Sequence, residues 1–228
     1  MKQRHQDIER LYRALNRLPT RIMRDCNGRL PWPDRGVYFF FEPGEVHEAT
    51  GQSRIVRVGT HAVSKGARTK LWSRLSQHRG TQAGRGNHRG SIFRLLVGAA
   101  LLDRDSNLTD LGTWGDKSST KRELRRHEQE VETAVSAYIG TMPFSWIAVN
   151  DEPDKRSKRA AIERNAIALL SRVNGNSHHP SAQWLGHHCP RVAVRDSGLW
   201  NIRHTADEYD REFLNLLEQA VEDTMAAQ

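Results

Sequence analysis

The chain has 228 residues, of which 37% are apolar, and a formal net charge of +8. This apolar share supports a folded core and excludes a fully disordered chain, and the longest apolar run, Leu95 to Leu102, is too short to span a bilayer. The N-terminus carries charges throughout, unlike a signal peptide, and only Cys26 and Cys189 occur, so we expect a cytoplasmic protein without a disulfide framework.

Positive charge is concentrated in one part of the chain. No Asp or Glu occurs between Glu48 and Asp103. The same stretch contains ten Lys or Arg residues: Arg54, Arg57, Lys65, Arg68, Lys70, Arg74, Arg79, Arg85, Arg89 and Arg94. A field of one sign suits a polyanion, so we expect a nucleic acid partner and no membrane association.

Apolar periodicity predicts the elements of the first half of the chain. The spacing of Ile8, Leu11 and Leu15 indicates an amphipathic helix that Pro19 closes. The expected elements are a helix at 5–18, a loop at 19–35, a strand at 36–42, a hairpin loop at 43–53, a strand at 54–59, a helix at 69–79, a glycine-rich loop at 80–90 and a helix at 90–102.

The second half is more polar. It predicts a loop at 103–120, a charged helix at 120–139, a strand at 144–149, a helix at 156–172 and a helix at 207–223. Residues 174–198 are rich in Gly, Pro, His and Ser, and their pattern predicts no element. We therefore expect an α/β (α+β) fold in which helices flank a small three-stranded antiparallel sheet.

Arg74 and His78 lie one turn apart on the predicted helix 69–79, so their side chains project side by side. The planar guanidinium of Arg matches phosphate geometry, and His moves protons near neutral pH. A solvated basic face is the alternative interpretation. Leu71 and Leu75 share this face, so we expect both polar groups to point inward.

Glu163 interrupts an apolar stripe formed by Ala160, Ile167 and Leu170. A carboxylate in such a stripe must be paired or must hold a cation. The two interpretations are a structural salt bridge, for example to Arg74, and a Mg²⁺ ligand. Mg²⁺ keeps most of its waters, so a single carboxylate is sufficient.

Two further residues are candidates for chemistry. Tyr38 lies on an apolar strand, where a core role is the alternative, and as a base it would need a proton acceptor such as His78. Asn174 follows the helix that carries Glu163, where Asn is usually a cap.

Together these motifs resemble the GIY-YIG nuclease superfamily. GVY at 36–38 is similar to the first signature, and VRVG at 56–59 aligns with the second. RLSQH at 74–78 resembles the family's arginine helix, IERNAI at 162–167 its glutamate helix, and RVN at 172–174 its terminal Asn. The predicted order of strands and helices is also that of the family.

The resemblance implies a domain organisation. An N-terminal helix and loop at 1–35 would precede a nuclease domain at 36–176, in which about 103–143 form a helical insertion. A helical C-terminal extension would occupy 177–228. The resemblance itself covers roughly 36–102 and 144–176.

The resemblance also implies a function, that of an endonuclease which uses Mg²⁺ (or Mn²⁺) to hydrolyse DNA phosphodiester bonds. Glu163 would hold the metal and Arg74 would stabilise the transition state. Tyr38, relayed through His78, would activate water, and Asn174 would orient the phosphate or a metal-bound water.

One position departs from the family's pattern. Arg57 stands where the second signature has a Tyr. Arg cannot act as a base, but it can hold a phosphate. His61, just downstream, is a candidate for the proton-accepting role, and loss of cleavage is the alternative outcome.

Basic residues around this region are expected to contact duplex DNA. They are Lys65, Arg68, Lys70, Arg79, Arg85, His88 and Arg89. A non-catalytic nucleic-acid-binding protein on the same scaffold is the alternative function. A zinc site in the tail (His178, His179 and 187–189) is a weaker hypothesis, because no CxxC or HxxxH pair occurs.

Overall fold

The computed structural model describes residues 2–108, 112–116, 125–126, 128–175 and 178–227. Within these ranges the α-helices and β-strands are α1 (Lys2–Leu15), β1 (Arg21–Ile22), β2 (Gly36–His47), β3 (Gln52–Gly59), α2 (Leu71–Arg79), α3 (Ile92–Arg104), α5 (Gln129–Gly140), β4 (Pro143–Ala148), α6 (Lys158–Leu170), α7 (Val192–Ser197) and α8 (Phe213–Ala226). Short 3₁₀ helices lie at Met23–Asp25, His88–Gly90, Arg172–Asn174 and Leu185–His188. No helix among the described residues is long and apolar enough to cross a membrane.

The described strands form one antiparallel sheet in the order β1-β4-β2-β3. The mixed α/β architecture agrees with the sequence analysis, but the expected number of three strands is wrong because β1 adds a fourth. Its two residues pair with Phe144 and Pro143 of β4. A strand this short, inside a segment predicted as a loop, is below the length at which alternation gives a signal.

The hairpin between β2 and β3 is tighter than the loop predicted at 43–53. β2 continues through Pro43 and Gly44, and Val46 still pairs with Ser53 of β3. The register shifts between Phe41 and Val46, and such an irregularity accommodates a residue that lacks an N–H. Pro43 and Gly44, which predicted a loop, therefore lie at an irregularity within β2.

Most predicted helices are present with shifted ends. The first runs from Lys2 to Leu15 instead of 5–18, and α6 is shorter than 156–172. α5 covers the later part of the helix predicted at 120–139, while 117–124 and 127 lie outside the described residues. The unassigned stretch 174–198 contains the 3₁₀ helix at Leu185–His188 and α7, which are too short to show periodicity.

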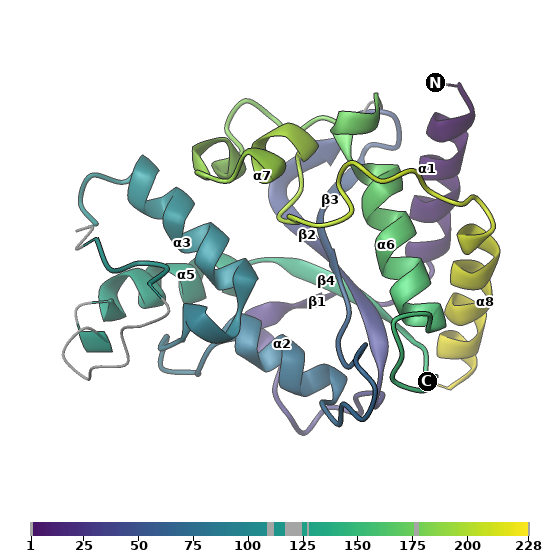
Figure 1. Ribbon diagram of the computed structural model, residues 1–228, viewed down its shortest axis with the longest axis horizontal. Helices are drawn as coiled ribbons and strands as arrows, with labels where there is room; N and C mark the ends of the chain where they lie inside the picture. The colour runs from purple at the N-terminus through teal and green to yellow at the C-terminus, as the bar shows by residue number, and fades with distance from the viewer. Residues whose placement is uncertain (1, 109–111, 117–124, 127, 176–177, 228) are drawn as a thin grey trace.

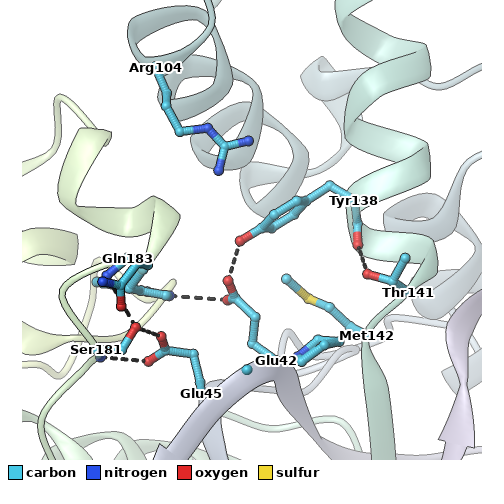
Figure 2. A pocket seen from close by; sticks show the side chains of 11 residues that line it. Glu42, Glu45, Arg104, Tyr138, Thr141, Met142, Ser181 and Gln183 are labelled. Carbon is cyan, nitrogen blue, oxygen red and sulfur yellow. Dashed lines mark hydrogen bonds between the residues drawn. The ribbon is translucent and has the colours of Figure 1, made fainter.

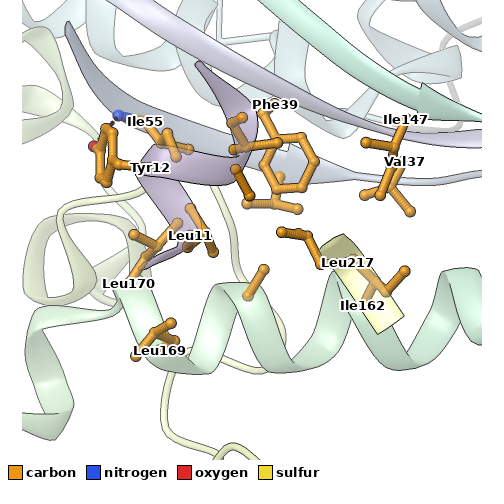
Figure 3. Packing of buried hydrophobic residues seen from close by; sticks show 14 of the residues in the cluster. Leu11, Tyr12, Val37, Phe39, Ile55, Ile147, Ile162, Leu169, Leu170 and Leu217 are labelled. Carbon is orange, nitrogen blue, oxygen red and sulfur yellow. Dashed lines mark hydrogen bonds between the residues drawn. The ribbon is translucent and has the colours of Figure 1, made fainter. Parts of the chain in front are cut away.

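Helices cover both faces of the sheet (Figure 1). Val37 and Phe39 of β2 face a cluster built with α1, α6 and α8, and Figure 3 shows Leu11 and Ile162 packed there. Tyr38 and Phe40 face the opposite cluster, built with α2, α3 and α5. Because side chains on both faces of β2 are buried, its first half is continuously apolar from Val37 to Phe41.

The segment after α7 runs alongside β3, the outermost strand of the sheet (Figure 1). The N–H of Trp200 donates to the carbonyl of Val56 at 2.7 Å. The Asn201 side chain bonds both backbone groups of Val58, at 3.2 and 2.9 Å. A chain segment far away in sequence thus covers an edge that would otherwise be open.

Candidate active site

Tyr38 of β2 and His78 of α2 are in direct contact. The Tyr38 hydroxyl lies 2.8 Å from Nε2 of His78, and Nδ1 of His78 lies 2.7 Å from the Ser91 hydroxyl. Both rings are fully buried. Burial, together with the charges of Arg74 and Arg57, lowers the pKa of His78 well below its usual value. The imidazole is therefore neutral, and one of its two bonded nitrogens carries a lone pair that accepts a hydrogen bond.

Gly59 makes room for the Tyr38 ring. It is the cross-strand partner of Tyr38, and a Cβ at this position would overlap the phenol hydroxyl. Any other residue would displace the ring from His78. Gly59, the last residue of the VRVG motif, is thus needed because it has no side chain and leaves space for the phenol.

Arg57 lies on the same face, opposite Phe40 of β2. Its Nη1 donates to the carbonyl of Trp200, its guanidinium lies 4.8 Å from the centre of the Phe93 ring, and only 5% of the residue is exposed. Burial lowers the pKa of Arg57, and the neighbouring Tyr38 opposes that shift. This placement favours a cation that acts on Tyr38, whereas the sequence suggested contact with phosphate.

Glu163 approaches from α6, on the other face, and reaches the end of β3. Its Oε1 accepts the backbone N–H of Thr60 at 3.1 Å. The structure gives Oε2 no hydrogen-bond or ion-pair partner among the described residues. Burial raises the pKa of Glu163, while the Thr60 N–H and the charges of Arg57, His204 and Arg74 oppose the shift.

This carboxylate fits a divalent cation, since it is a half-buried anion with one oxygen unused. The described residues contain no cluster of three or more His, Cys, Asp or Glu side chains that could hold a metal. A site at Glu163 would therefore have one or two protein ligands, as Mg²⁺ tolerates.

His61 follows Thr60 directly and has a fixed tautomer. Its Nδ1 lies 2.9 Å from the Thr69 carbonyl, which only accepts, so Nδ1 carries the hydrogen and Nε2 carries a lone pair. Nε2 is buried and unpartnered. Burial lowers the pKa of His61 to about 4, and the charge of Arg159 adds to the effect. The lone pair is thus available at neutral pH.

The loop that carries His61 is held firmly. Arg159 of α6 donates to the carbonyls of His61 and Ala62, at 2.5 and 3.3 Å. Ala62 has a positive φ of 53°, which is uncommon for a residue with a Cβ. Backbone strain of this kind collects at functional sites.

Arg74 is the half-exposed cation of the group. Its Nη1 donates to Gln77 Oε1 and to the Gly90 carbonyl, both at 3.1 Å. Its charge lowers the pKa of four neighbours in the site, namely Arg57, His61, His78 and Glu163. Arg74 thus acts electrostatically on four of the predicted residues, and Tyr38 joins this group through its bond to His78.

Asn174 is not among the residues that surround Arg74. Its side-chain nitrogen donates to the carbonyls of Ala168, at 3.1 Å, and Asp207, at 3.0 Å. Its own carbonyl accepts from Arg4. The residue therefore ties the end of α6 to the segment before α8, which agrees with the alternative of a structural Asn at a helix end and lends no support to the catalytic role that the resemblance implies.

The residues expected to contact DNA divide into two groups. Lys65, Arg68, Lys70 and Arg85 are exposed. By contrast, His88 is 2% exposed, with its N–H and Nδ1 on Glu132, and Arg89 forms a two-pronged ion pair with Glu128.

Arg79 belongs with the engaged group, because it donates to the Cys26 carbonyl and covers the Trp72 ring. His88, Arg89 and Arg79 are thus held by contacts within the fold. Lys70 is exposed but pairs with Asp34 at 2.9 Å on the surface, so four of the seven expected DNA contacts have partners in the protein.

The tail histidines also have partners in the fold. Nε2 of His178 lies 2.9 Å from the Tyr12 hydroxyl, and His188 pairs with Asp103 at 2.9 Å. His187 Nε2 bonds the Ser181 carbonyl at 2.8 Å. These distinct partners leave the zinc hypothesis without support from the described residues.

A pocket of about 420 Å³ lies at the far end of β2 (Figure 2). The Glu42 carboxylate points into it and accepts from the indole N–H groups of Trp184 and Trp200, both at 3.1 Å, and from Tyr138. The Glu45 carboxylate likewise accepts hydrogen bonds from the Ser181 N–H and from Arg54 Nε. Both acids are saturated by the fold, so this pocket is a weaker candidate than the cluster around Arg74.

The sequence analysis missed Ser91, Trp200 and His204. Ser91 was detectable as an N-cap before an apolar helix, where its hydroxyl accepts the Arg94 N–H. Trp200 and His204 reach the site only through tertiary contacts, and no local pattern marks them.

A family model described as the GIY-YIG domain matches residues 2–227. No curated protein and no solved structure matches the chain. The matched range includes nearly the whole chain and all of the residues described above.

Proposed function

The chain belongs to the GIY-YIG family, and we propose that it is a divalent-metal-dependent endonuclease that hydrolyses DNA phosphodiester bonds. Nuclease activity in general follows from the family. The observation that best supports the finer proposal is the buried contact between the Tyr38 hydroxyl and His78 Nε2, with Gly59 leaving space for the ring.

Water activation is assigned to Tyr38 and His78. The Tyr38 oxygen takes a proton from the attacking water while its own proton passes to Nε2 of the neutral His78. Arg57 faces the phenol from β3 and stabilises the negative charge that develops on it. Arg57 therefore acts as a positioning and electrostatic residue.

His61 is assigned the role of a second proton acceptor. In the chain's second signature Arg57 replaces a phenol, and the lone pair on His61 Nε2 lies just beyond the same strand. Its lowered pKa keeps it neutral and able to accept a proton or a hydrogen bond from water.

Glu163 would hold Mg²⁺ or Mn²⁺, whose charge stabilises the phosphate and the leaving oxygen. Arg74, half-exposed beside it, would donate to the phosphate oxygens as negative charge builds up on them. Arg74 and an ion held by Glu163 would thus both supply positive charge to the phosphate.

Duplex DNA is the proposed substrate. The exposed cations Lys65, Arg68 and Lys70 precede or begin α2, so they lie on the approach to Arg74. Contacts of this kind attract any phosphate backbone and carry no base preference.

A non-catalytic nucleic-acid-binding protein is the second candidate. Arg57 in place of the second signature Tyr favours it, because that change removes a phenol from the site. A plasmid-nicking assay with Mg²⁺, against EDTA, separates the two: cleavage supports the nuclease, and binding without cleavage supports the alternative.

A further inference from the structure

The segment after α7 approaches the Glu163 carboxylate. Asn201 bonds both backbone groups of Val58. Val58 lies two residues before Thr60, the residue whose N–H donates to Glu163. Asn201 therefore anchors this segment on the strand that ends at the proposed metal ligand, and three residues later the chain reaches His204.

The turn that carries His204 is fixed on its other side as well. Asn174 donates to the Asp207 carbonyl at 3.0 Å, and Asn165 of α6 accepts the Asp210 N–H at 2.7 Å. His204 itself has a positive φ of 63°, in the left-handed region. A non-glycine residue is held in this conformation only where its surroundings determine it.

The ring of His204 is oriented by a carboxylate. Its Nδ1 lies 2.7 Å from Asp207 Oδ2, and the His204 side chain is 35% exposed. With Nδ1 bonded to Asp207, Nε2 is the ring nitrogen available to another partner, and it has no hydrogen-bond partner among the described residues. His204 also contributes to lowering the pKa of Glu163, against the effect of burial, so the two side chains share one neighbourhood beyond the end of β3.

We propose that Nε2 of His204 is a second protein donor to the divalent ion that Glu163 holds. The proposal rests on the proposed function. A histidine that binds a metal through one nitrogen usually donates its other N–H to a carboxylate, as His204 does to Asp207. The C-terminal segment is then part of the active site.

A nitrogen donor changes which ion the site prefers. Mg²⁺ takes oxygen ligands, whereas imidazole favours transition ions. The apo protein should therefore bind Mn²⁺ more tightly than Mg²⁺, and part of that preference should depend on His204.

Manganese spectroscopy tests the assignment without DNA or turnover. The full-length chain is loaded with Mn²⁺, and pulsed EPR detects whether a ¹⁴N nucleus is bonded to the ion. The variants are His204→Asn, chosen because Asn tolerates a positive φ, and His187→Ala as the control, since His187 contacts the Ser181 carbonyl elsewhere. Circular dichroism melting verifies that each variant folds.

The proposal predicts ¹⁴N coupling in the wild type and in His187→Ala, its loss in folded His204→Asn, and a Mn²⁺ dissociation constant about tenfold higher there. Coupling that persists in His204→Asn, or a wild type without coupling or without Mn²⁺ binding, would overturn it. Coupling without plasmid cleavage would reject the proposed function alone, and cleavage without coupling would reject only the His204 assignment.

Discussion

The hydroxyl of Tyr38 and Nε2 of His78 lie 2.8 Å apart in a fully buried setting. The two residues come from β2 and α2, and the chain between them supplies Arg57, Thr60 and His61. Because the Tyr38 hydroxyl is bonded to a neutral imidazole, a proton that leaves the phenol passes to His78.

Removing only the hydroxyl of Tyr38 should separate chemistry from folding. Tyr38→Phe keeps the ring between Phe40 and His78, so melting temperature and DNA affinity should change little. Cleavage should fall by about 10²- to 10⁴-fold, the usual contribution of acid–base catalysis. Single-turnover cleavage rates test this.

His78→Gln should be non-additive with Tyr38→Phe, because the two groups act as one relay. Rates that multiply in the double variant would show that the two side chains work independently, and an unchanged rate in Tyr38→Phe would remove the phenol from the mechanism.

Arg57 variants test the departure from the family signature. Arg57→Ala removes a buried cation between Trp200 and Phe93, so it should lower the cleavage rate more than DNA affinity and should also lower the melting temperature. Arg57→Tyr should also reduce cleavage, because a phenol carries no positive charge to stabilise the developing charge on Tyr38. Cleavage gained in Arg57→Tyr would instead support the non-catalytic alternative.

The salt dependence of DNA affinity should show whether the exposed cations contact the phosphate backbone. Each phosphate contact contributes about one unit to the slope of log K against log salt. Replacing Lys65, Arg68 and Lys70 by Ala should flatten the slope by up to about three units. Arg17→Ala is a matched control, because Arg17 pairs with Glu222 on the α1–α8 side. Equal slopes in all proteins would place the DNA elsewhere.

Acid should destabilise the fold through its buried histidines. Burial lowers the pKa of His47 and His61 to about 4, and those of His78 and His178 well below the usual value. An unfolded His titrates near 6.5, so below that pH the unfolded chain binds protons that the folded chain does not. The free energy of unfolding should therefore fall from about pH 6.5 toward pH 4, by up to about 1.4 kcal/mol per pH unit for each histidine.

Urea unfolding at pH 7, 6 and 5 measures this slope, and His47→Gln should make it shallower. Stability that stays constant over the range would show that these histidines are not buried as neutral rings.

The sequence could predict much of the site, because its parts lie on regular elements. An apolar face on the helix at 69–79 turned His78 inward, and Glu163 within an apolar stripe indicated an enclosed carboxylate. It could not predict what covers Arg57, since the Trp200 carbonyl lies 143 residues away in the chain. For the same reason Glu128 and Glu132, which capture Arg89 and His88, gave no local signal.

Plasmid nicking by the wild type and Glu163→Gln tests the central claim most directly. The amide keeps the shape of the carboxylate and can still accept the Thr60 N–H, but it loses the charge that would hold the ion. Glu152→Gln, at an exposed carboxylate, is the control. We predict nicking by the wild type and the control with Mg²⁺ or Mn²⁺ and none with EDTA, and no nicking by Glu163→Gln despite unchanged DNA affinity. Cleavage that survives EDTA or Glu163→Gln would contradict the account.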